Sequence, residues 1–323
     1  MRDLSNPLKV IDLLSDGECH SGEELAAIFG ITRAAVNKYI KLIREWGVEL
    51  TSVPRKGYQL TYPLDLLKFA KIEHFYTQHT DKPINLDVIP VIDSTNQYLL
   101  ERLNTLSTGF ACVAEYQQAG RGRRGRQWFS PFASNLYLSM YWRLEQGPAA
   151  AMGLSLAIGI VIAQVLREIS GQDIKVKWPN DLYLNDKKLA GILVEIAGKT
   201  GDVAHIVIGM GINLRMHNPN QDIVNQAWSN LGDIDRNLLV AKLLYRLRDA
   251  LYCFETEGLS AFIKQWQPLD NFADRPVKLI IGETEIKGIA KGINEQGALL
   301  LEQNGILKAY IGGEISLRAD NTK

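Results

Sequence analysis

Residues 148–166 form a run of 19 residues without a charged side chain. A helix of this length can cross a bilayer, so the run permits two classes of fold: a membrane protein, or a domain large enough to bury a long helix. The run contains the polar Gln164, and no second segment resembles it, which favours a buried helix. The first residues include Asp3 and Asp12 and lack the apolar core of a signal peptide. We therefore expect a cytoplasmic protein with no membrane contact.

The composition of the chain further narrows the class of protein to which it can belong. It has 323 residues, 46% of them hydrophobic, which predicts two or three globular domains. Lys plus Arg and Asp plus Glu both number 36, so any affinity for nucleic acid must come from locally clustered charge. Cys19, Cys112 and Cys253 contain no CxxC pair, which excludes a disulfide framework and argues against a zinc site.

Residues 1–60 have the pattern of a winged helix-turn-helix. Ser21 and Glu24 have the spacing of a capping box at a helix start. A turn at Gly30 separates this helix from a second one that begins at Thr32. Two short strand-like runs then surround a Pro-Arg-Lys-Gly turn, which predicts a hairpin wing.

The charge of this module is distributed as DNA binding requires. Residues 2–24 carry six acids and two bases, whereas residues 33–56 carry six bases and two acids. The basic charge thus falls on the second helix and on the wing, where a major groove and its phosphates would lie. The alternatives are a small helical bundle with a solvated basic face and a winged helix that serves as a protein–protein adaptor. The residues expected to face DNA are Ser21, Gly22, Thr32, Arg33, Asn37, Lys38, Lys41, Arg55 and Lys56.

The rest of the chain reads as two further units, so the predicted fold class is α+β. After the winged helix-turn-helix, a connector and a central mixed α/β catalytic domain are expected over residues 61–270, and a small SH3-like β-barrel of five short strands over 271–323. The expected helices cover 64–76, 148–170, 236–255 and 259–267. The expected strands before residue 271 lie near 86–92, 110–116, 135–144, 174–184, 187–196 and 203–214.

The most distinctive motif is the arginine loop, which we define as residues 120–126, Gly-Arg-Gly-Arg-Arg-Gly-Arg. It formally satisfies GxGxxG, but no helix follows to direct its dipole at a pyrophosphate, and no acidic residue stands about 20 positions later. Residues 116–144 contain five arginines and no acid. Guanidinium groups on a glycine-rich backbone suit an anionic ligand. A flexible basic surface loop is the alternative.

A Walker A loop, the second nucleotide-binding motif to consider, is also excluded. Gly198-Lys199-Thr200 has the ending of a Walker A loop, but Leu193 occupies the position of its first glycine. If the chain uses ATP, it does not hold it with a P-loop.

Three other segments carry groups suited to a polar ligand. Residues 94–96, Ser-Thr-Asn, stand at a helix start, although they also make an ordinary N-cap. Residues 177–181, Lys-Trp-Pro-Asn-Asp, face Lys188 across a predicted hairpin. Residues 209–213 end a strand with two glycines, which indicates a close approach by a ligand or a β-bulge. The five histidines have no ligand spacing, so electrostatic stabilisation is favoured over nucleophilic catalysis.

Together these segments resemble the biotin–protein ligases that also act as repressors of the biotin operon, over essentially the whole chain. The resemblance is carried in order by HSGEELAAIFGITRAAVNKYI, VPRKGYQL, VIDSTNQYLL, AEYQQAGRGRRGRQWFSPF, NLYLSM, VKWPNDLYL, KLAGILVE, IGMGIN and RPVKLIIG. It implies a biotin–[acetyl-CoA-carboxylase] ligase that joins biotin and ATP, with Mg²⁺, into biotinyl-5′-adenylate. Biotin then passes to a lysine of the biotin carboxyl carrier protein. The adenylate is also expected to promote a homodimer that binds the biotin operator.

The resemblance also implies roles for individual residues. Biotin would be held by Ser94, Thr95, Asn96, Gln117, Arg121, Gly122, Arg123 and Lys188. The adenylate side would include Lys177, Trp178, Asn180, Asn213 and Trp228. Lys188, Arg123 and Asp181 would be catalytic, with Asp181 on the Mg²⁺ side. A ligand-responsive DNA-binding regulator without efficient ligase activity is the main rival, and a lipoate-type ligase with a DNA-binding module is the other.

Overall fold

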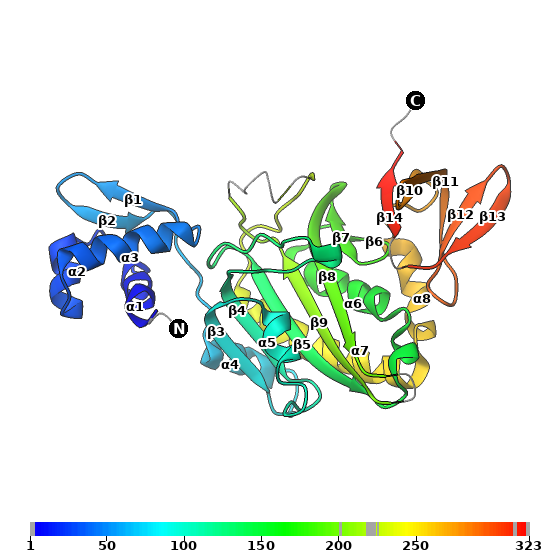
Figure 1. Cartoon of the computed structure of the whole chain (residues 1–323), viewed down its shortest axis with the longest axis horizontal. Coiled ribbons are helices and arrows are strands. Elements are labelled where there is room, and N and C mark those ends of the chain that lie inside the picture. Colours follow the sequence, from blue (N-terminus) through cyan, green and yellow to red (C-terminus); the bar gives the residue numbers. More distant parts are fainter. Residues whose placement is uncertain (1–3, 200–201, 218–223, 225, 313–314, 321–323) are drawn as a thin grey trace.

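The computed structural model describes residues 4–199, 202–217, 224, 226–312 and 315–320. Three parts follow one another along the long axis of the molecule (Figure 1). A small helical module lies at one end, a mixed α/β domain occupies the middle, and a sheet of short strands lies at the other end. The fold class is therefore α+β, as the sequence predicts.

The N-terminal module is a three-helix unit with a two-stranded wing. Its elements are α1 (Ser5–Leu14), α2 (Gly22–Phe29), α3 (Arg33–Glu45), β1 (Leu50–Val53) and β2 (Gly57–Leu60). The capping box is present, because the Ser21 hydroxyl accepts from the backbone of Glu24 and the Glu24 carboxylate accepts from the backbone of Ser21. Gly30 ends α2 in the left-handed conformation that a glycine adopts without strain.

A seven-stranded sheet forms the centre of the molecule. Its strands are β3 (Leu86–Ile92), β4 (Ala111–Gln117), β5 (Leu136–Leu144), β6 (Lys175–Lys177), β7 (Asp181–Leu184), β8 (Lys187–Ala197) and β9 (Ala204–Ile212). The order is β3-β4-β5-β9-β8-β7-β6, and only the β3–β4 pair is parallel. The predicted hairpin between β7 and β8 turns at Asn185 and Asp186, both with positive φ.

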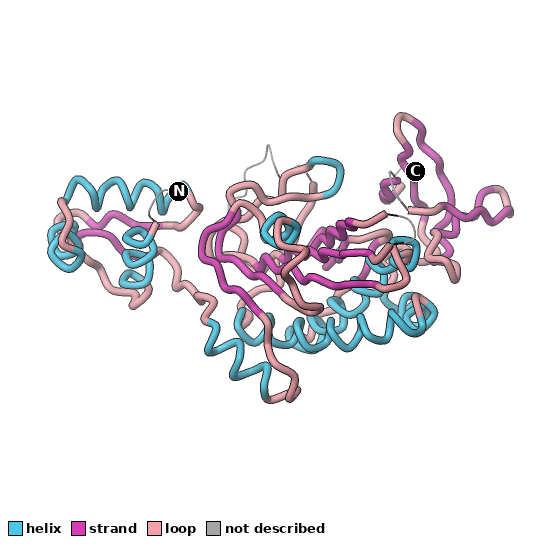
Figure 2. The backbone as a smooth tube through the Cα atoms, turned by 60° about the horizontal axis from the view of Figure 1, so that its bottom comes forward, coloured by secondary structure: helices cyan, strands magenta, loops and turns pink. Residues whose placement is uncertain are grey.

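Helices cover both faces of the sheet unequally (Figure 2). The short α5 (Thr95–Leu100) lies on one face, with Leu99 buried against Cys112 and Tyr141. The other face is covered by α4 (Phe69–Thr77), α6 (Leu154–Ser170), α7 (Arg236–Glu257) and α8 (Ser260–Trp266). Among the described residues, Pro148–Ser170 is long and apolar enough to cross a membrane, but 67% of its most apolar window is buried inside the protein.

Two of the expected helices begin later than the sequence suggests. The residues before α4 are extended, because the backbone N–H of Leu67 donates to the buried Glu115 carboxylate and that of Lys68 donates to Asn237. The buried helix starts at Leu154, after a short 3-10 turn (Pro148–Ala151). Gly153 separates the two with φ +81°, and a Cβ at Gly153 would lie 2.7 Å from the Leu259 side chain.

The C-terminal unit has the five expected strands. They are β10 (Pro276–Ile281), β11 (Thr284–Ile293), β12 (Leu299–Gln303), β13 (Ile306–Tyr310) and β14 (Ile315–Ala319), paired antiparallel in the order β13-β12-β11-β10-β14. Glu314, expected at the start of the last strand, lies outside the described residues. The buried side chains of these strands join the core of the central domain. The Trp178 indole N–H also donates across the boundary to the Gly297 carbonyl, 3.0 Å away.

The winged helix-turn-helix also contacts the central domain. Trp46, which follows α3, stacks on Phe132 with ring centroids 5.7 Å apart, and its carbonyl accepts from the Phe132 N–H. Gly47 lies so close that a Cβ on it would be 2.9 Å from the Pro131 side chain. The winged helix-turn-helix thus rests on the segment that returns from the arginine loop.

Candidate active site

One cavity of about 390 Å³ gathers the residues predicted to hold a ligand. It lies where the start of α5 and the ends of β4 and β9 meet the arginine loop, the 177–181 segment and β14. All of the predicted biotin, adenylate and catalytic residues line it, namely Ser94, Thr95, Asn96, Gln117, Arg121, Gly122, Arg123, Lys177, Trp178, Asn180, Asp181, Lys188, Asn213 and Trp228. Positions far apart in the chain therefore form a single site.

The neutral end of the cavity is built from α5, β4 and β5. The Thr95 N–H and hydroxyl both donate to Gln117 Oε1, at 2.9 and 3.1 Å, and Gln117 Nε2 donates to Ser130. Ser139 Oγ lies 2.7 Å from Thr95 Oγ1 and 2.5 Å from Asn96 Oδ1. These side chains are buried, so they present fixed donors and acceptors to a small polar group.

The two glycines of β9 have a role that the sequence did not reveal. The strand pairs in regular register on both sides, so neither glycine forms a β-bulge. A Cβ at Gly209 would lie 2.1 Å from Asn96 Oδ1, and a Cβ at Gly211 would lie 2.3 Å from the Trp128 indole. The glycines therefore make room for two side chains of the site itself.

The opposite end of the cavity is strongly cationic. Among the described residues, seven basic side chains line the cavity against a single carboxylate, that of Asp181; they are Arg121, Arg123, Arg124, Arg126, Lys177, Lys188 and Arg318. A concave surface with this imbalance attracts carboxylate and phosphate groups.

Asp181 holds two ammonium groups together. Its Oδ1 lies 2.8 Å from Lys188 Nζ and its Oδ2 lies 3.5 Å from Lys177 Nζ. Burial would raise the pKa of Asp181, but the charges of Lys188 and Lys177 outweigh it and hold that pKa below its usual value. Burial lowers the pKa of Lys177 to about 8, and its ammonium also donates to the Tyr183 hydroxyl at 2.9 Å.

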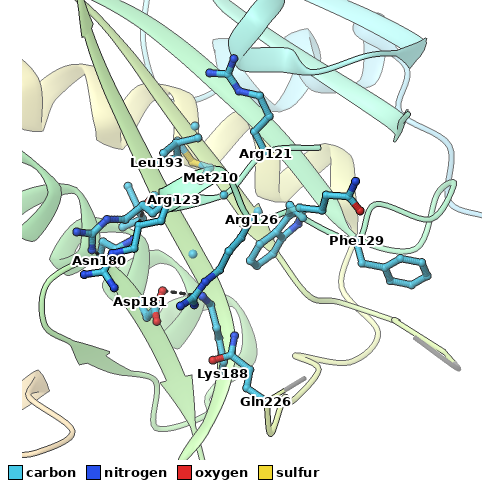
Figure 3. A pocket seen from close by; sticks show the side chains of 18 of the residues that line it. Arg121, Arg123, Arg126, Phe129, Asn180, Asp181, Lys188, Leu193, Met210 and Gln226 are labelled. Carbon is cyan, nitrogen blue, oxygen red and sulfur yellow. Dashed lines mark hydrogen bonds and ion pairs between the residues drawn. The ribbon is translucent and has the colours of Figure 1, made fainter. Parts of the chain in front are cut away.

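The arginine loop points its side chains in different directions (Figure 3). Arg123 and Arg126 extend toward Asn180, Asp181 and Lys188, and Arg123 Nη1 donates to Asn180 Oδ1 at 2.6 Å. Burial, with repulsion from the neighbouring arginines, lowers the pKa of Arg123. Arg121 is directed away from this group and forms an ion pair with Glu195.

Three of the predicted adenylate residues also make contacts with the rest of the protein that fix their positions. Trp178 is 1% exposed, and its indole N–H is already used in the contact with the C-terminal unit, so it supports the cavity wall. Asn213 is buried with its backbone N–H donating to Leu189. Trp228 forms an isolated bridge with Lys188, which places residues 227–229 beside Lys188.

Several residues of the site carry no signal in the sequence. Ser139 and Trp128 were not selected because a serine in a strand and a tryptophan after a loop carry no motif. Trp128 lies with Lys188 Nζ 5.5 Å from its ring centroid, and its buried indole nitrogen has no hydrogen-bond partner in the described part of the chain. Arg318 comes from β14 of the C-terminal unit. The run of arginines was the only sequence signal that pointed to Arg126.

The site does not fit a metal ion held by the protein. Both oxygens of Asp181 face lysine ammonium groups, and no group of three or more His, Cys, Asp or Glu side chains suited to a metal occurs among the described residues. That Asp181 stands on the Mg²⁺ side of the site stays a prediction.

The predicted DNA-facing surface lies on α3 and the wing. The exposed members are Thr32, Arg33, Asn37, Lys38, Lys41, Arg55 and Lys56. Ser21 and Thr32 cap α2 and α3 by accepting backbone N–H groups, and Gly22 begins α2. The Tyr58 hydroxyl of the wing donates to Asn37 Oδ1 at 2.9 Å, which ties the wing to the exposed face of α3.

Comparisons with known proteins agree with this arrangement. Three family models match in order: HTH domain over residues 8–59, Biotin/lipoate A/B protein ligase family over 88–213, and Biotin protein ligase C terminal domain over 273–318. The bifunctional ligase/repressor of Salmonella typhimurium is 60% identical over 323 residues, 99% of each chain. That of Escherichia coli is 58% identical over 99% of each chain. The chain belongs to the bifunctional ligase/repressor family.

A solved structure supports the same assignment for the ligase part. The biotin protein ligase of Aquifex aeolicus, in complex with biotin and ATP, matches this ligase/repressor with a TM-score of 0.65 and 30% identity. The match covers 73% of this chain and 99% of the Aquifex chain. The ligase fold and the helix-turn-helix therefore occur in one polypeptide.

Proposed function

We propose that this ligase/repressor condenses biotin with ATP in the 390 Å³ cavity, transfers biotin to a lysine of a biotin carboxyl carrier protein, and uses the biotinyl-5′-adenylate as its corepressor. The observation that carries the proposal is the division of one cavity into a neutral, hydrogen-bonding end and a cationic end. Biotin joins a neutral ureido ring to a carboxylate, and ATP supplies the phosphates. The chemistry of the cavity therefore matches the two substrates from end to end.

The neutral end would hold the biotin head group. Thr95, Asn96 and Gln117 are buried and already oriented by hydrogen bonds. Binding of biotin would therefore cost these side chains little further conformational entropy. Ser94 caps α5 beside them. The valeryl chain of biotin would then run past Trp128 toward Lys188, which places its carboxylate at the cationic end.

The first reaction step needs charge stabilisation at this cationic end. A biotin carboxylate oxygen attacks the α-phosphorus of ATP, forming the mixed anhydride and releasing pyrophosphate. The charge that develops on the phosphoryl oxygens would be stabilised by Lys188 and Arg123, with Arg126 and Lys177 nearby. Asp181 positions the two lysines, because one carboxylate holds both ammonium groups.

The second step needs orientation and the exclusion of water. The ε-amine of the carrier lysine attacks the carbonyl carbon of the mixed anhydride, an amide bond forms, and AMP leaves. The arginine loop would cover the intermediate, since Arg123 bonds Asn180 on one side and Arg124 bonds Ser316 of β14 on the other.

The ligase activity is tested by incubating the protein with biotin, ATP, Mg²⁺ and a carrier domain and then weighing the carrier. A mass increase of one biotinyl group supports the proposal. A carrier of unchanged mass, obtained with protein that is folded and binds biotin, contradicts it.

The repressor function would depend on dimerisation. A single winged helix offers few phosphate contacts, so specific binding to a two-fold operator needs two copies. Residues 194–197 of β8 pair with β9 on one side and with no strand on the other among the described residues, which leaves an edge that a second copy can use. Operator DNA and ATP place this activity in the cytoplasm.

A titration of operator DNA with and without the adenylate, followed by sedimentation, tests this part. The adenylate should raise both the operator affinity and the dimer population. By linkage, DNA should tighten adenylate binding by the same factor. Equal affinity and equal dimer population in both states would show that the product does not regulate the DNA-binding module.

Each of the three domains expected from the sequence would have its own role. We propose DNA binding by residues 1–60, a connector and catalysis by 61–270, and closure of the nucleotide side by 271–323. The three matched family regions lie within these limits, which supports the division.

A further inference from the structure

A continuous chain of hydrogen bonds runs beneath the neutral end of the cavity. It begins at Gln117, which accepts from the Thr95 backbone N–H, passes through the Thr95 and Ser139 hydroxyls to Asn96, and continues to Glu195 on β8. From Glu195 it reaches the arginine loop through the ion pair with Arg121. We call this set the polar chain; its members are Gln117, Thr95, Ser139, Asn96, Glu195 and Arg121. It connects the proposed head-group site to the loop that covers the intermediate.

Glu195 occupies the central position in the polar chain. Its Oε2 accepts from Asn96 Nδ2 at 2.8 Å, and its Oε1 pairs with Arg121 Nη2. Because the amide nitrogen of Asn96 faces Glu195, the amide oxygen faces Ser139 and the cavity floor. The carboxylate itself does not line the cavity, and its side chain is 27% exposed. Glu195 thus contacts residues of the site without being placed to contact a ligand.

Arg121 differs from the other arginines of the loop. Its guanidinium points away from Asp181 and Lys188, whereas Arg123 and Arg126 point toward them (Figure 3). In addition to the ion pair with Glu195, its Nη1 donates to Gln97 Oε1 on α5 at 2.7 Å. Arg121 therefore fixes the start of the loop to α5 and β8, and leaves the later arginines to face the cationic end.

We propose that Glu195 is a positioning residue of the ligase, which orients Asn96 for the biotin head group and anchors the arginine loop through Arg121. The proposal rests on the proposed function, because it assumes that biotin occupies the neutral end. One carboxylate then serves two requirements of the reaction: the shape of the head-group site and the closed position of the loop. Because its two oxygens contact Asn96 and Arg121, binding of biotin in the head-group site and closure of the arginine loop are linked.

Two substitutions separate these two roles. Glu195→Gln keeps an oxygen that can accept from Asn96 but removes the charge that pairs with Arg121. It should speed dissociation of the adenylate about tenfold, the size expected for the loss of a charged hydrogen bond, and change the KM for biotin much less. Glu195→Ala removes both contacts and should also raise the KM for biotin about tenfold. In both variants any fall in kcat for carrier biotinylation at saturating biotin should be smaller than these changes, because Lys188 and Arg123 are untouched.

The division between KM and kcat distinguishes positioning from a purely structural role. A loss of folded protein would lower kcat and leave the KM for biotin unchanged. Glu145→Gln is the matched control, because it removes a surface carboxylate that pairs with Arg143 at the end of β5, outside the polar chain. Its adenylate dissociation rate and KM should equal those of wild type.

The outcomes also separate this proposal from the proposed function. If wild-type protein forms no adenylate from biotin and ATP, the proposed function fails. If wild type forms it and Glu195→Gln retains the wild-type dissociation rate, the loop-anchoring role of Glu195 is overturned. If folded Glu195→Ala also keeps the wild-type KM for biotin, the head-group role is overturned as well; should that variant fail to fold, the Glu195→Gln dissociation rate decides.

Discussion

Replacing Lys177 with Met should change how the stability of the protein depends on pH. The side chain is 3% exposed, and its ammonium lies 2.9 Å from the Tyr183 hydroxyl and 3.5 Å from Asp181 Oδ2. Burial disfavours the charged form, so the pKa of Lys177 falls from the ordinary 10.5 to about 8. The folded protein therefore holds this proton less tightly than the unfolded chain does, and folding releases a proton between these two pH values. Stability due to this group must rise as the pH rises through that window.

The size of the effect follows from the two pKa values. One pH unit corresponds to about 1.4 kcal/mol, so the unfolding free energy of wild type relative to Lys177→Met should grow by about 3 kcal/mol between pH 8 and pH 10.5. The two groups bonded to its ammonium do not titrate in this window: the pKa of Asp181 is held below its usual value, and burial raises the pKa of Tyr183 to about 12. Met is chosen because it is unbranched and keeps most of the buried volume.

Urea unfolding of both proteins at closely spaced pH values from 8 to 10.5, followed by tryptophan fluorescence, measures the difference. The chain has several structural units, which can unfold in separate transitions. The two proteins are therefore compared only in the unfolding transition whose midpoint changes on substitution. Lys175→Met is the matched control, since Lys175 lies two residues earlier on β6 with its ammonium bonded to the Pro268 carbonyl at the surface. A difference between wild type and Lys177→Met that stays constant or shrinks across the window would refute the reasoning. At neutral pH the variant should also use ATP less well, because it removes a cation from the cavity.

Three further substitutions test the site. Lys188→Ala should slow adenylate formation about tenfold to a hundredfold, because a charged contact of about 1.5–3 kcal/mol is lost at the reacting centre; an unchanged rate in single-turnover adenylation would remove it from the site. Arg123→Ala should speed release of the adenylate by at least about tenfold, for the same reason, and an unaltered release rate would show that the loop does not hold the phosphate. Gly211→Ala should displace Trp128, since the new Cβ would lie 2.3 Å from its indole, and weaken biotin binding at least about tenfold by calorimetry. Wild-type affinity in that variant would mean that the tryptophan is not part of the biotin site.

The winged helix-turn-helix was accessible from the sequence because its signals are local. The capping box of Ser21 and Glu24, the left-handed Gly30 and the start at Thr32 each depend on a few adjacent residues, and each is present as expected. The contact of Trp46 with Phe132 is different, since it joins positions 86 residues apart and no local rule selects it. The sequence therefore predicted the module but not where it rests.

The boundaries of two helices show the same limit. Residues 64–68 have the apolar spacing of a helix, yet their backbone is extended because Glu115 and Asn237 accept its N–H groups. Likewise, residues 148–153 lack any charge, but Gly153 interrupts the helix where Leu259 packs on it. In both cases a distant partner outweighs local propensity, which is worth only a fraction of a kcal/mol per residue.

For the active site, the sequence by itself determined the chemistry and the tertiary structure decided the geometry. Arginines, a lysine pair and an Asp in short motifs are visible in one dimension, because charged groups in such numbers cannot be buried without a ligand or a partner. Three features depend on strands that meet only in the folded sheet. They are the pairing of each Asp181 oxygen with its ammonium group, the course of the polar chain through Ser139 and Glu195, and the direction of Arg121 away from Asp181 and Lys188. Strand order and register bring these positions together, and neither can be read from the spacing of residues along the chain.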